Sequence, residues 1–222
     1  MTSPLMEVQK IRIACNRRLV CQEVSFSIGP GERLAVLGSE ASGKSLLMRM
    51  MAGLLRPEAG RVLWRGVDLV GLSPDQRVGG IGVLFRDPDA RFLCATPGEE
   101  VALTPASLGL AGEALAVRVT ESLFMAGLEE RCADLSWSEL SASQRYRVGI
   151  AAVLAARPQL LLVDEPGNAL SDVGEVDFAR RLQEFGDRYG TAMVVFTSRD
   201  VRASLFAKRI VRLVTNDIGG KW

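Results

Sequence analysis

The sequence predicts an α/β protein built on a parallel sheet, with a mostly helical insertion. Short apolar runs at residues 33–37, 160–163 and 192–197 have the length and composition of buried strands. Helix-like periodicity occurs between them, for instance over 113–126 and 144–156. Strands that alternate with helices are typical of a parallel sheet. With 222 residues, the chain is long enough to bury a sizeable core as one large domain or two lobes.

The composition excludes several classes of protein. Hydrophobic residues make up 48% and charged residues 24%, which is the balance of a folded soluble protein. The net charge of +1 provides no basic field that would favour nucleic acid as a partner. Histidine is absent, which excludes His-based triads, HExxH zinc sites and any imidazole acid or base. The four cysteines form no CxxC pair, so we expect buried thiols in a reducing compartment.

We expect a cytoplasmic location. Residues 1–10 lack the basic and apolar regions of a signal peptide. The longest apolar stretch, 148–163, is interrupted by Arg157 and Pro158, so it does not provide the ~20 apolar residues of a membrane-spanning helix. Any membrane association is therefore expected to come through a partner.

The chain is expected to form one domain over 1–222 with two parts. Four further strands are predicted, at residues 7–13, 19–28, 61–64 and 80–86. From about 87 to 157 the strand signal fades and helical periodicity dominates. The prediction is a core of residues 1–86 and 158–222 with a helical subdomain between them.

A glycine-rich loop follows the strand predicted at 33–37. Gly38-Ser-Glu-Ala-Ser-Gly43-Lys44-Ser45 fits the pattern G-x-x-x-x-G-K-[ST], and an apolar helix follows it. Backbone N–H groups and the helix N-terminus of such a loop hold phosphate oxygens. Lys44 is expected to reach the β- and γ-phosphates, and the Ser45 hydroxyl to bind Mg²⁺. The predicted nucleotide-binding residues are Gly38, Ser39, Glu40, Ala41, Ser42, Gly43, Lys44, Ser45 and Leu46.

The run Leu160-Leu-Leu-Val163-Asp164-Glu165-Pro166 provides two carboxylates. A buried strand that ends in Asp places that carboxylate at the C-terminal edge of the sheet, beside the loop. Asp164 is expected to hold Mg²⁺, directly or through water, and Glu165 to polarise the attacking water as general base. The run taken alone also fits an ordinary strand end with solvated acids. Its combination with the phosphate loop favours the catalytic interpretation.

The order of these motifs resembles the ATP-binding subunits of ABC transporters over essentially the whole chain. Leu140-Ser-Ala-Ser-Gln144-Arg145 lies where that family has its LSGGQ signature. The segment from Phe85 to Ala102 resembles the Q-loop region of energy-coupling-factor and cobalt/nickel-type importer ATPases. The resemblance implies a P-loop NTPase fold with a RecA-like core, an N-terminal antiparallel β subdomain and a helical insertion lobe.

The resemblance further implies an ATPase, with ATP and Mg²⁺ as cofactors, that powers a vitamin or metal-ion importer. Two such domains would dimerise head to tail, as a homodimer or heterodimer. Each ATP would then lie between one phosphate loop and the partner's signature residues, here Ser141, Ala142, Ser143 and Gln144. A transmembrane permease or coupling subunit would contact the lobe around 87–110 and hold the chain at the inner face of the membrane. A plain surface helix pair is the other interpretation of that lobe.

Several positions depart from the family pattern. Arg86 stands where the family has the Q-loop glutamine, and Arg199 where it has the switch histidine. Ala142 and Ser143 replace the two signature glycines. Leu170-Ser171 replaces the Leu-Asp that ends the D-loop, and no aromatic residue is found near Cys15, where an adenine-stacking side chain is expected.

Two interpretations of these departures stay open. The motifs have drifted in a catalytically weak or inactive subunit, which would pair with a competent homologue in a regulatory or structural role. Alternatively, Arg86 and Arg199 supply fixed positive charge near the γ-phosphate, as arginine fingers do. The change of several motifs together favours the first interpretation.

Overall fold

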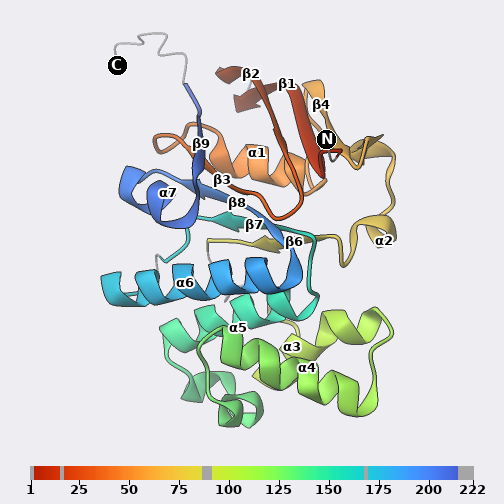
Figure 1. Cartoon of the computed structure of the whole chain (residues 1–222), viewed down its shortest axis with the longest axis vertical. Helices are drawn as coiled ribbons and strands as arrows, with labels where there is room; N and C mark the ends of the chain where they lie inside the picture. Colours follow the sequence, from red (N-terminus) through yellow and green to blue (C-terminus); the bar gives the residue numbers. More distant parts are fainter. Residues whose placement is uncertain (1–2, 16–17, 87–91, 168–169, 215–222) are drawn as a thin grey trace.

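Two sheets of different type and a set of helices form the layers of the molecule (Figure 1). The computed structural model describes residues 3–15, 18–86, 92–167 and 170–214. A four-stranded antiparallel sheet forms one outer layer, and a single helix separates it from a five-stranded parallel sheet (Figure 1). The remaining long helices lie on the other side of the parallel sheet.

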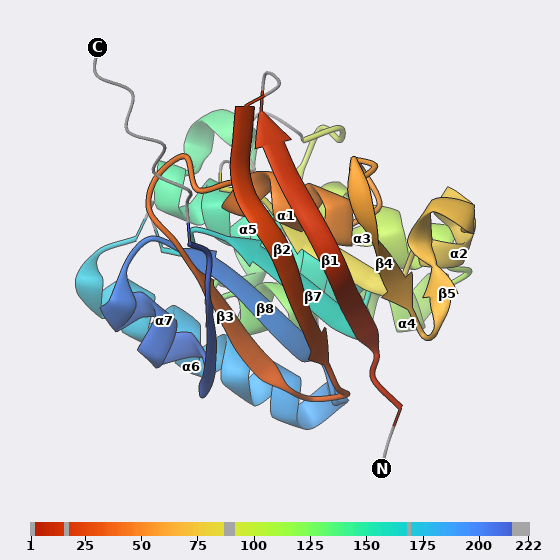
Figure 2. The same cartoon turned by 90° about the horizontal axis from the view of Figure 1, so that it is seen from above.

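The antiparallel sheet contains the N-terminal strands. Its strand order is β2-β1-β4-β5, formed by β1 (Met6–Cys15), β2 (Arg18–Ile28), β4 (Ala59–Trp64) and β5 (Val67–Asp68). Seen from above, β1 and β2 run across α1 (Lys44–Met51) (Figure 2). Ile11 and Ile13 of β1 and Leu47 of α1 are fully buried in one apolar cluster. This sheet therefore packs directly onto the helix that follows the phosphate loop.

The parallel sheet has the order β6-β7-β8-β3-β9. Its strands are β3 (Arg33–Leu37), β6 (Ile81–Leu84), β7 (Leu160–Asp164), β8 (Ala192–Thr197) and β9 (Arg209–Arg212). Every residue of β7 and of β8 is buried, because helices cover both faces of the sheet. This cover explains why the two strands are continuous apolar runs instead of alternating ones.

Successive residues of β7 point to opposite faces of the sheet. Leu160 and Leu162 belong to the apolar cluster on the side of α1, whereas Leu161 and Val163 belong to the cluster on the side of the other helices. Continuing this alternation directs Asp164 toward the side of α1 and of the phosphate loop. The strand period therefore determines which face receives the first carboxylate.

The helices include two that match the predicted periodicity, α4 (Gly112–Met125) and α5 (Ala142–Ala155). The others are α2 (Pro74–Arg77), α3 (Pro97–Ser107), α6 (Asp172–Tyr189) and α7 (Asp200–Phe206), with short 3-10 turns at Leu69–Gly71, Glu130–Asp134 and Trp137–Glu139. Among the helices of the described ranges, none has both the length and the apolar character needed to cross a membrane.

The α/β class and the predicted strands are confirmed, with ends that shift by up to two residues. The sequence interpretation missed α6, the longest helix, because its composition is largely polar. Its buried stripe consists mainly of Phe178, Ala179, Leu182 and Phe185, which pack under the parallel sheet. The two-residue strand β5 was also missed, because a segment this short has no detectable periodicity.

We expect Leu162→Ala to lower the free energy of unfolding by about 2–5 kcal/mol, because it leaves a cavity in a fully buried central strand. Urea unfolding followed by circular dichroism measures the change. Val201→Ala is the matched control, since Val201 is 78% exposed and its truncation is expected to stay within about 0.5 kcal/mol. A cost below 1 kcal/mol for Leu162→Ala would contradict the assigned burial.

Candidate nucleotide-binding site

The predicted site residues meet at the C-terminal edge of the parallel sheet. The phosphate loop follows β3, Asp164 ends β7, and Thr197 ends β8. β3 pairs with β8 and β8 with β7, so these three strand ends are neighbours. Ligands of open parallel sheets bind in the crevice at this edge.

The phosphate loop is shaped by the close approach of β1. Gly43 is the N-cap of α1 with a φ of 86°, a left-handed conformation that favours glycine. A Cβ at this position would lie 2.7 Å from Cγ2 of Ile13. Glycine is therefore required here both by the backbone angle and by the strand that packs on the loop.

Lys44 lies inside the loop that it follows in sequence. Its Nζ donates to the backbone oxygens of Gly38, at 2.8 Å, and of Ser39, at 2.7 Å. The side chain is largely buried. The ammonium group is therefore held within the loop, where phosphate oxygens could replace the two carbonyl oxygens as acceptors.

A hydrogen bond joins the loop to the end of β7. The Ser45 hydroxyl donates to Oδ2 of Asp164 over 2.9 Å. Oδ1 of Asp164 is buried and has no hydrogen-bond partner among the described residues. Burial raises the pKa of Asp164 above its ordinary value of 3.8, while the Ser45 hydrogen bond acts in the opposite direction.

The donor set at this position fits Mg²⁺. Hydroxyl and carboxylate oxygens are its preferred protein ligands, and a buried carboxylate oxygen without a partner is available for a cation or its bound water. Within the described ranges, no group of three or more His, Cys, Asp or Glu side chains could form a metal cage. An ion held by Ser45 and Asp164 would therefore need phosphate oxygens and water to complete its coordination.

Glu165 follows Asp164 in a left-handed backbone conformation, with a φ of 44°. Its backbone N–H donates to the oxygen of Phe196 at 2.8 Å, which fixes the chain between β7 and β8. Oε1 lies 3.8 Å from Nζ of Lys44, and Oε2 accepts a hydrogen bond from the Thr197 hydroxyl at 3.1 Å. One carboxylate oxygen therefore faces the phosphate loop and the other faces the end of β8.

Two residues that the sequence interpretation missed complete this cluster. Nη1 of Arg202, on α7, donates to Oε2 of Glu165 at 3.2 Å. The Arg202 guanidinium also binds both carboxylate oxygens of Glu175 on α6. All three side chains are buried. The only sequence signal was an arginine on the apolar face of α7, which does not identify its partners.

The predicted signature residues form the first turn of α5. Ser141 is the N-cap: its Oγ accepts from the backbone N–H of Gln144 at 3.2 Å, and Oε1 of Gln144 accepts from the backbone N–H of Ser141 at 2.9 Å. Ala142 and Ser143 begin the helix itself. The Ser141 hydroxyl keeps its proton available for a further acceptor, because in this cap it only accepts.

The structure places the two predicted switch arginines on the surface. Arg86 is exposed two residues after the end of β6, and its positive charge has only a minor lowering effect on the pKa of Asp164. Arg199 is exposed at the N-cap of α7, and its backbone N–H donates to the Thr197 hydroxyl at 3.2 Å. The Cys15 side chain and residues 87–91 of the predicted Q-loop segment lie outside the described parts of the structure.

The loop, the Ser45–Asp164 pair and the adjoining glutamate define a P-loop nucleotide-binding protein. The sequence profile of the ABC transporter family matches residues 21–168. The chain therefore belongs to the ABC transporter family, and the predicted ATPase class is confirmed at the level of that family.

Curated relatives agree with this assignment. An energy-coupling factor transporter ATP-binding protein of Caldanaerobacter subterraneus subsp. tengcongensis is 30% identical over 196 residues, which cover 86% of this chain and 67% of the relative. Another, from Lacticaseibacillus paracasei, is 32% identical over 200 residues, covering 89% and 71%. The chain spans 67% of the length of the first of these relatives, and 64% and 57% of two putative ABC transporter ATP-binding proteins from Methanosarcina acetivorans and Methanosarcina mazei.

Solved structures confirm the fold. CbiO1 from Clostridium perfringens, part of the ABC transporter complex cbiONQ, superposes with a TM-score of 0.83 at 25% identity, covering 95% of this chain and 84% of the other. A dimeric ATP-binding cassette in a post-hydrolysis state, bound to ADP and Pi, gives a TM-score of 0.82 at 27% identity over 94% of each chain. The predicted P-loop fold with an antiparallel β subdomain, a parallel α/β core and a helical region is confirmed.

We expect Asp164→Asn to raise the free energy of unfolding at neutral pH in metal-free buffer. Since the folded-state pKa of Asp164 lies above its ordinary value, the fold favours the protonated form, and stability is lost as pH rises through the raised pKa. The gain of the variant should therefore disappear below pH 3.8, where Asp164 is protonated in both states. Urea titrations across this range measure the effect, and an asparagine variant less stable than the parent at neutral pH would contradict it.

Proposed function

We propose that this chain binds ATP with Mg²⁺ and hydrolyses it as the ATP-binding subunit of a membrane transporter. The observation that carries the proposal is the Ser45–Asp164 hydrogen bond, with the second Asp164 oxygen buried beside Glu165 and the phosphate loop. This arrangement offers a cation site and a general base side by side, at the end of one buried strand.

The residues divide the chemistry between them. The loop from Gly38 to Gly43 and Lys44 bind the phosphates, and Ser45 with Asp164 would hold the Mg²⁺ ion. The ion would supply positive charge that compensates the charge of the phosphate oxygens. Oε1 of Glu165, which faces the loop, orients the attacking water and accepts its proton.

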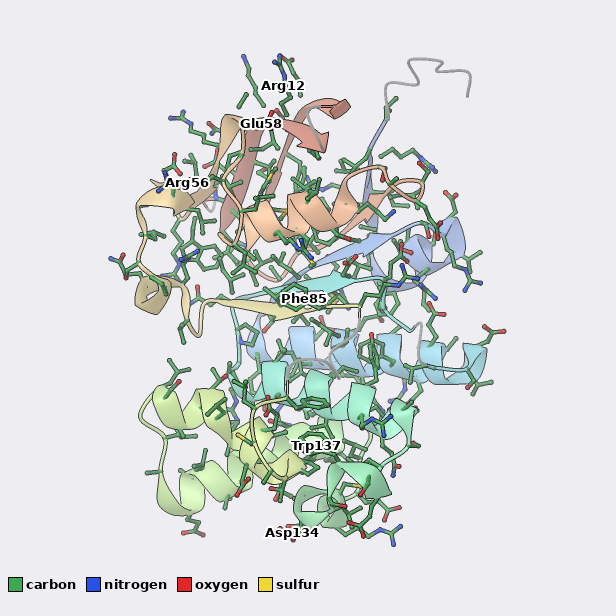
Figure 3. The ribbon with its side chains drawn as sticks, turned by 180° about the vertical axis from the view of Figure 1, so that it is seen from behind. Arg12, Arg56, Glu58, Phe85, Asp134 and Trp137 are labelled. Atoms are coloured by element: carbon green, nitrogen blue, oxygen red, sulfur yellow. The ribbon has the colours of Figure 1, made fainter. Side chains whose placement is uncertain are left out.

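The transporter role includes a second cassette and a membrane subunit. A dimeric cassette among the similar structures supports the first partner, with Ser141, Ala142, Ser143 and Gln144 acting on the partner's ATP. An apolar groove of about 360 Å³ supports the membrane subunit as the second partner, because its apolar lining offers a docking surface. The lining includes Val83, Phe85, Phe92, Leu103 and Val153. Phe85 lies at the end of β6, between the sheet and the helical layer that carries Trp137 (Figure 3).

The proposed cargo class is a vitamin or a transition-metal ion. Support comes from the energy-coupling factor proteins among the relatives and from cbiO1 among the similar structures. The chain would lie at the inner face of the membrane, held there by the permease. Residues 87–157 would form the helical subdomain that contacts it, and residues 1–86 and 158–222 the nucleotide-binding core.

A second candidate is a nucleotide-binding subunit with weak or no turnover, paired with a competent homologue. The observation that favours it is the first turn of α5, where Ala142 and Ser143, predicted to replace the family's two glycines, begin the helix with side chains of their own. Added Cβ atoms limit how closely the backbone can approach a phosphate.

Steady-state ATP turnover by the purified chain, alone and with a second cassette, separates the two candidates. We expect turnover of about 1 s⁻¹ or more, abolished in Glu165→Gln because the proton acceptor is removed. Lys44→Ala should weaken ATP binding by an order of magnitude or more, through loss of a charge-assisted phosphate contact.

The matched control is Lys208→Ala, which removes an exposed lysine outside the loop and should change neither binding nor turnover. Unchanged ATP affinity in Lys44→Ala would contradict the site. Binding without turnover, even with the second cassette present, would reject hydrolysis and favour the second candidate.

A further inference from the structure

We propose that Arg202 is a positioning residue for Glu165. It holds one carboxylate oxygen so that the other faces the phosphate loop, and it supplies the charge that balances Glu165 when ATP phosphates bind nearby. This inference rests on the proposed function, because it assigns Arg202 to the same ATP site.

The two oxygens of Glu165 have different surroundings. Oε2 accepts from the Thr197 hydroxyl, at 3.1 Å, and from Nη1 of Arg202, at 3.2 Å. Oε1 has Nζ of Lys44 at 3.8 Å, on the side of the phosphate loop. Two donors therefore anchor one oxygen and leave the other directed at the place where a γ-phosphate and its attacking water would lie.

Arg202 is itself firmly held. It is 4% exposed, and its Nη2 donates to Oε2 of Glu175 at 3.2 Å, while its Nε contacts the other oxygen of the same carboxylate. This two-point contact fixes the plane of the guanidinium, which lysine could not reproduce. Glu175 in turn packs against Gly167, where a Cβ would lie 2.8 Å from Cγ of Glu175. The orientation of Glu165 is thus tied to the start of α6.

Two cations and three carboxyl groups are buried in this cluster. Lys44 and Arg202 are the cations, Asp164 and Glu175 are the carboxyl groups beside Glu165, and all five residues are less than 9% exposed. A buried charge needs a partner, and removal of one member leaves another uncompensated. When the Lys44 ammonium binds the phosphates instead of Glu165, Arg202 is the cation among the described residues that still contacts Glu165.

A purely structural ion pair between Arg202 and Glu175 is the competing explanation. The two explanations differ in whether the contact of Arg202 with Glu165 affects the affinity for ATP. If Arg202 only holds α7 to α6, replacing both members of that pair should leave nucleotide binding unchanged. If Arg202 balances Glu165, the same double replacement leaves the Glu165 charge facing the phosphates and weakens binding.

The test is the affinity for adenosine 5′-(β,γ-imido)triphosphate with Mg²⁺, measured by calorimetry on the full chain. We expect Arg202→Gln, and the charge-balanced pair Arg202→Gln with Glu175→Gln, to bind about tenfold more weakly, the coupling typical of groups in contact. Adding Glu165→Gln to the double variant should restore the affinity of Glu165→Gln alone. Arg180→Gln, which removes an exposed ion-paired arginine of α6, should bind like the parent.

Turnover supplies the second readout. We expect kcat of the double variant to fall at least tenfold, in addition to any change in KM, because Glu165 is no longer directed at the attacking water. Parental affinity in the double variant, or a loss that Glu165→Gln does not restore, would overturn the proposal. If Arg202→Gln alone fails to fold, the nucleotide affinity of the double variant still tests the proposal. If the parent binds the nucleotide without turnover, hydrolysis is rejected, while the affinity comparison still tests Arg202.

Discussion

Burial of two consecutive carboxylates at the end of β7 is the constraint on which the site depends. Asp164 is the last residue of a fully buried strand and Glu165 follows it, so each of these buried acids needs a partner from another element. The Ser45 hydroxyl of the phosphate loop donates a hydrogen bond to Asp164. Glu165 is contacted by Lys44, Thr197 and Arg202, which come from three different segments. The contacts made by these acids thus also assemble the nucleotide site.

The architecture follows from the same constraint. The parallel sheet is covered on both faces, so its strand ends are the places where polar groups can gather without crossing the apolar core. The antiparallel sheet packs on α1 and shapes the loop through Ile13, which leaves space only for glycine at position 43. Both sheets therefore contribute to one phosphate-binding loop, although only the parallel sheet carries the carboxylates.

The chain has no histidine, and the contacts show which arginine supplies positive charge beside Glu165. Arg199, predicted to stand in place of the family's switch histidine, is exposed and reaches Thr197 through its backbone N–H, and Arg86 is also exposed. The arginine that contacts Glu165, the proposed general base, is Arg202 on the buried face of α7. Its guanidinium contacts Glu165 and Glu175 at the same time. The structure therefore pairs Glu165 with a buried arginine that is neither of the two arginines predicted from the sequence.

The sequence by itself determined the α/β class, the position of the phosphate loop and the two carboxylates, because strand period, glycine spacing and apolar runs are local properties of the chain. It also identified α4 and α5, which are rich in apolar residues. Only the tertiary structure decided that Asp164 bonds to Ser45, that Arg202 and not Arg199 reaches Glu165, and that Glu175 holds that arginine. These pairings join residues between 27 and 119 positions apart, and long-range contacts between buried charges depend on helix orientation and strand order, which no local pattern encodes.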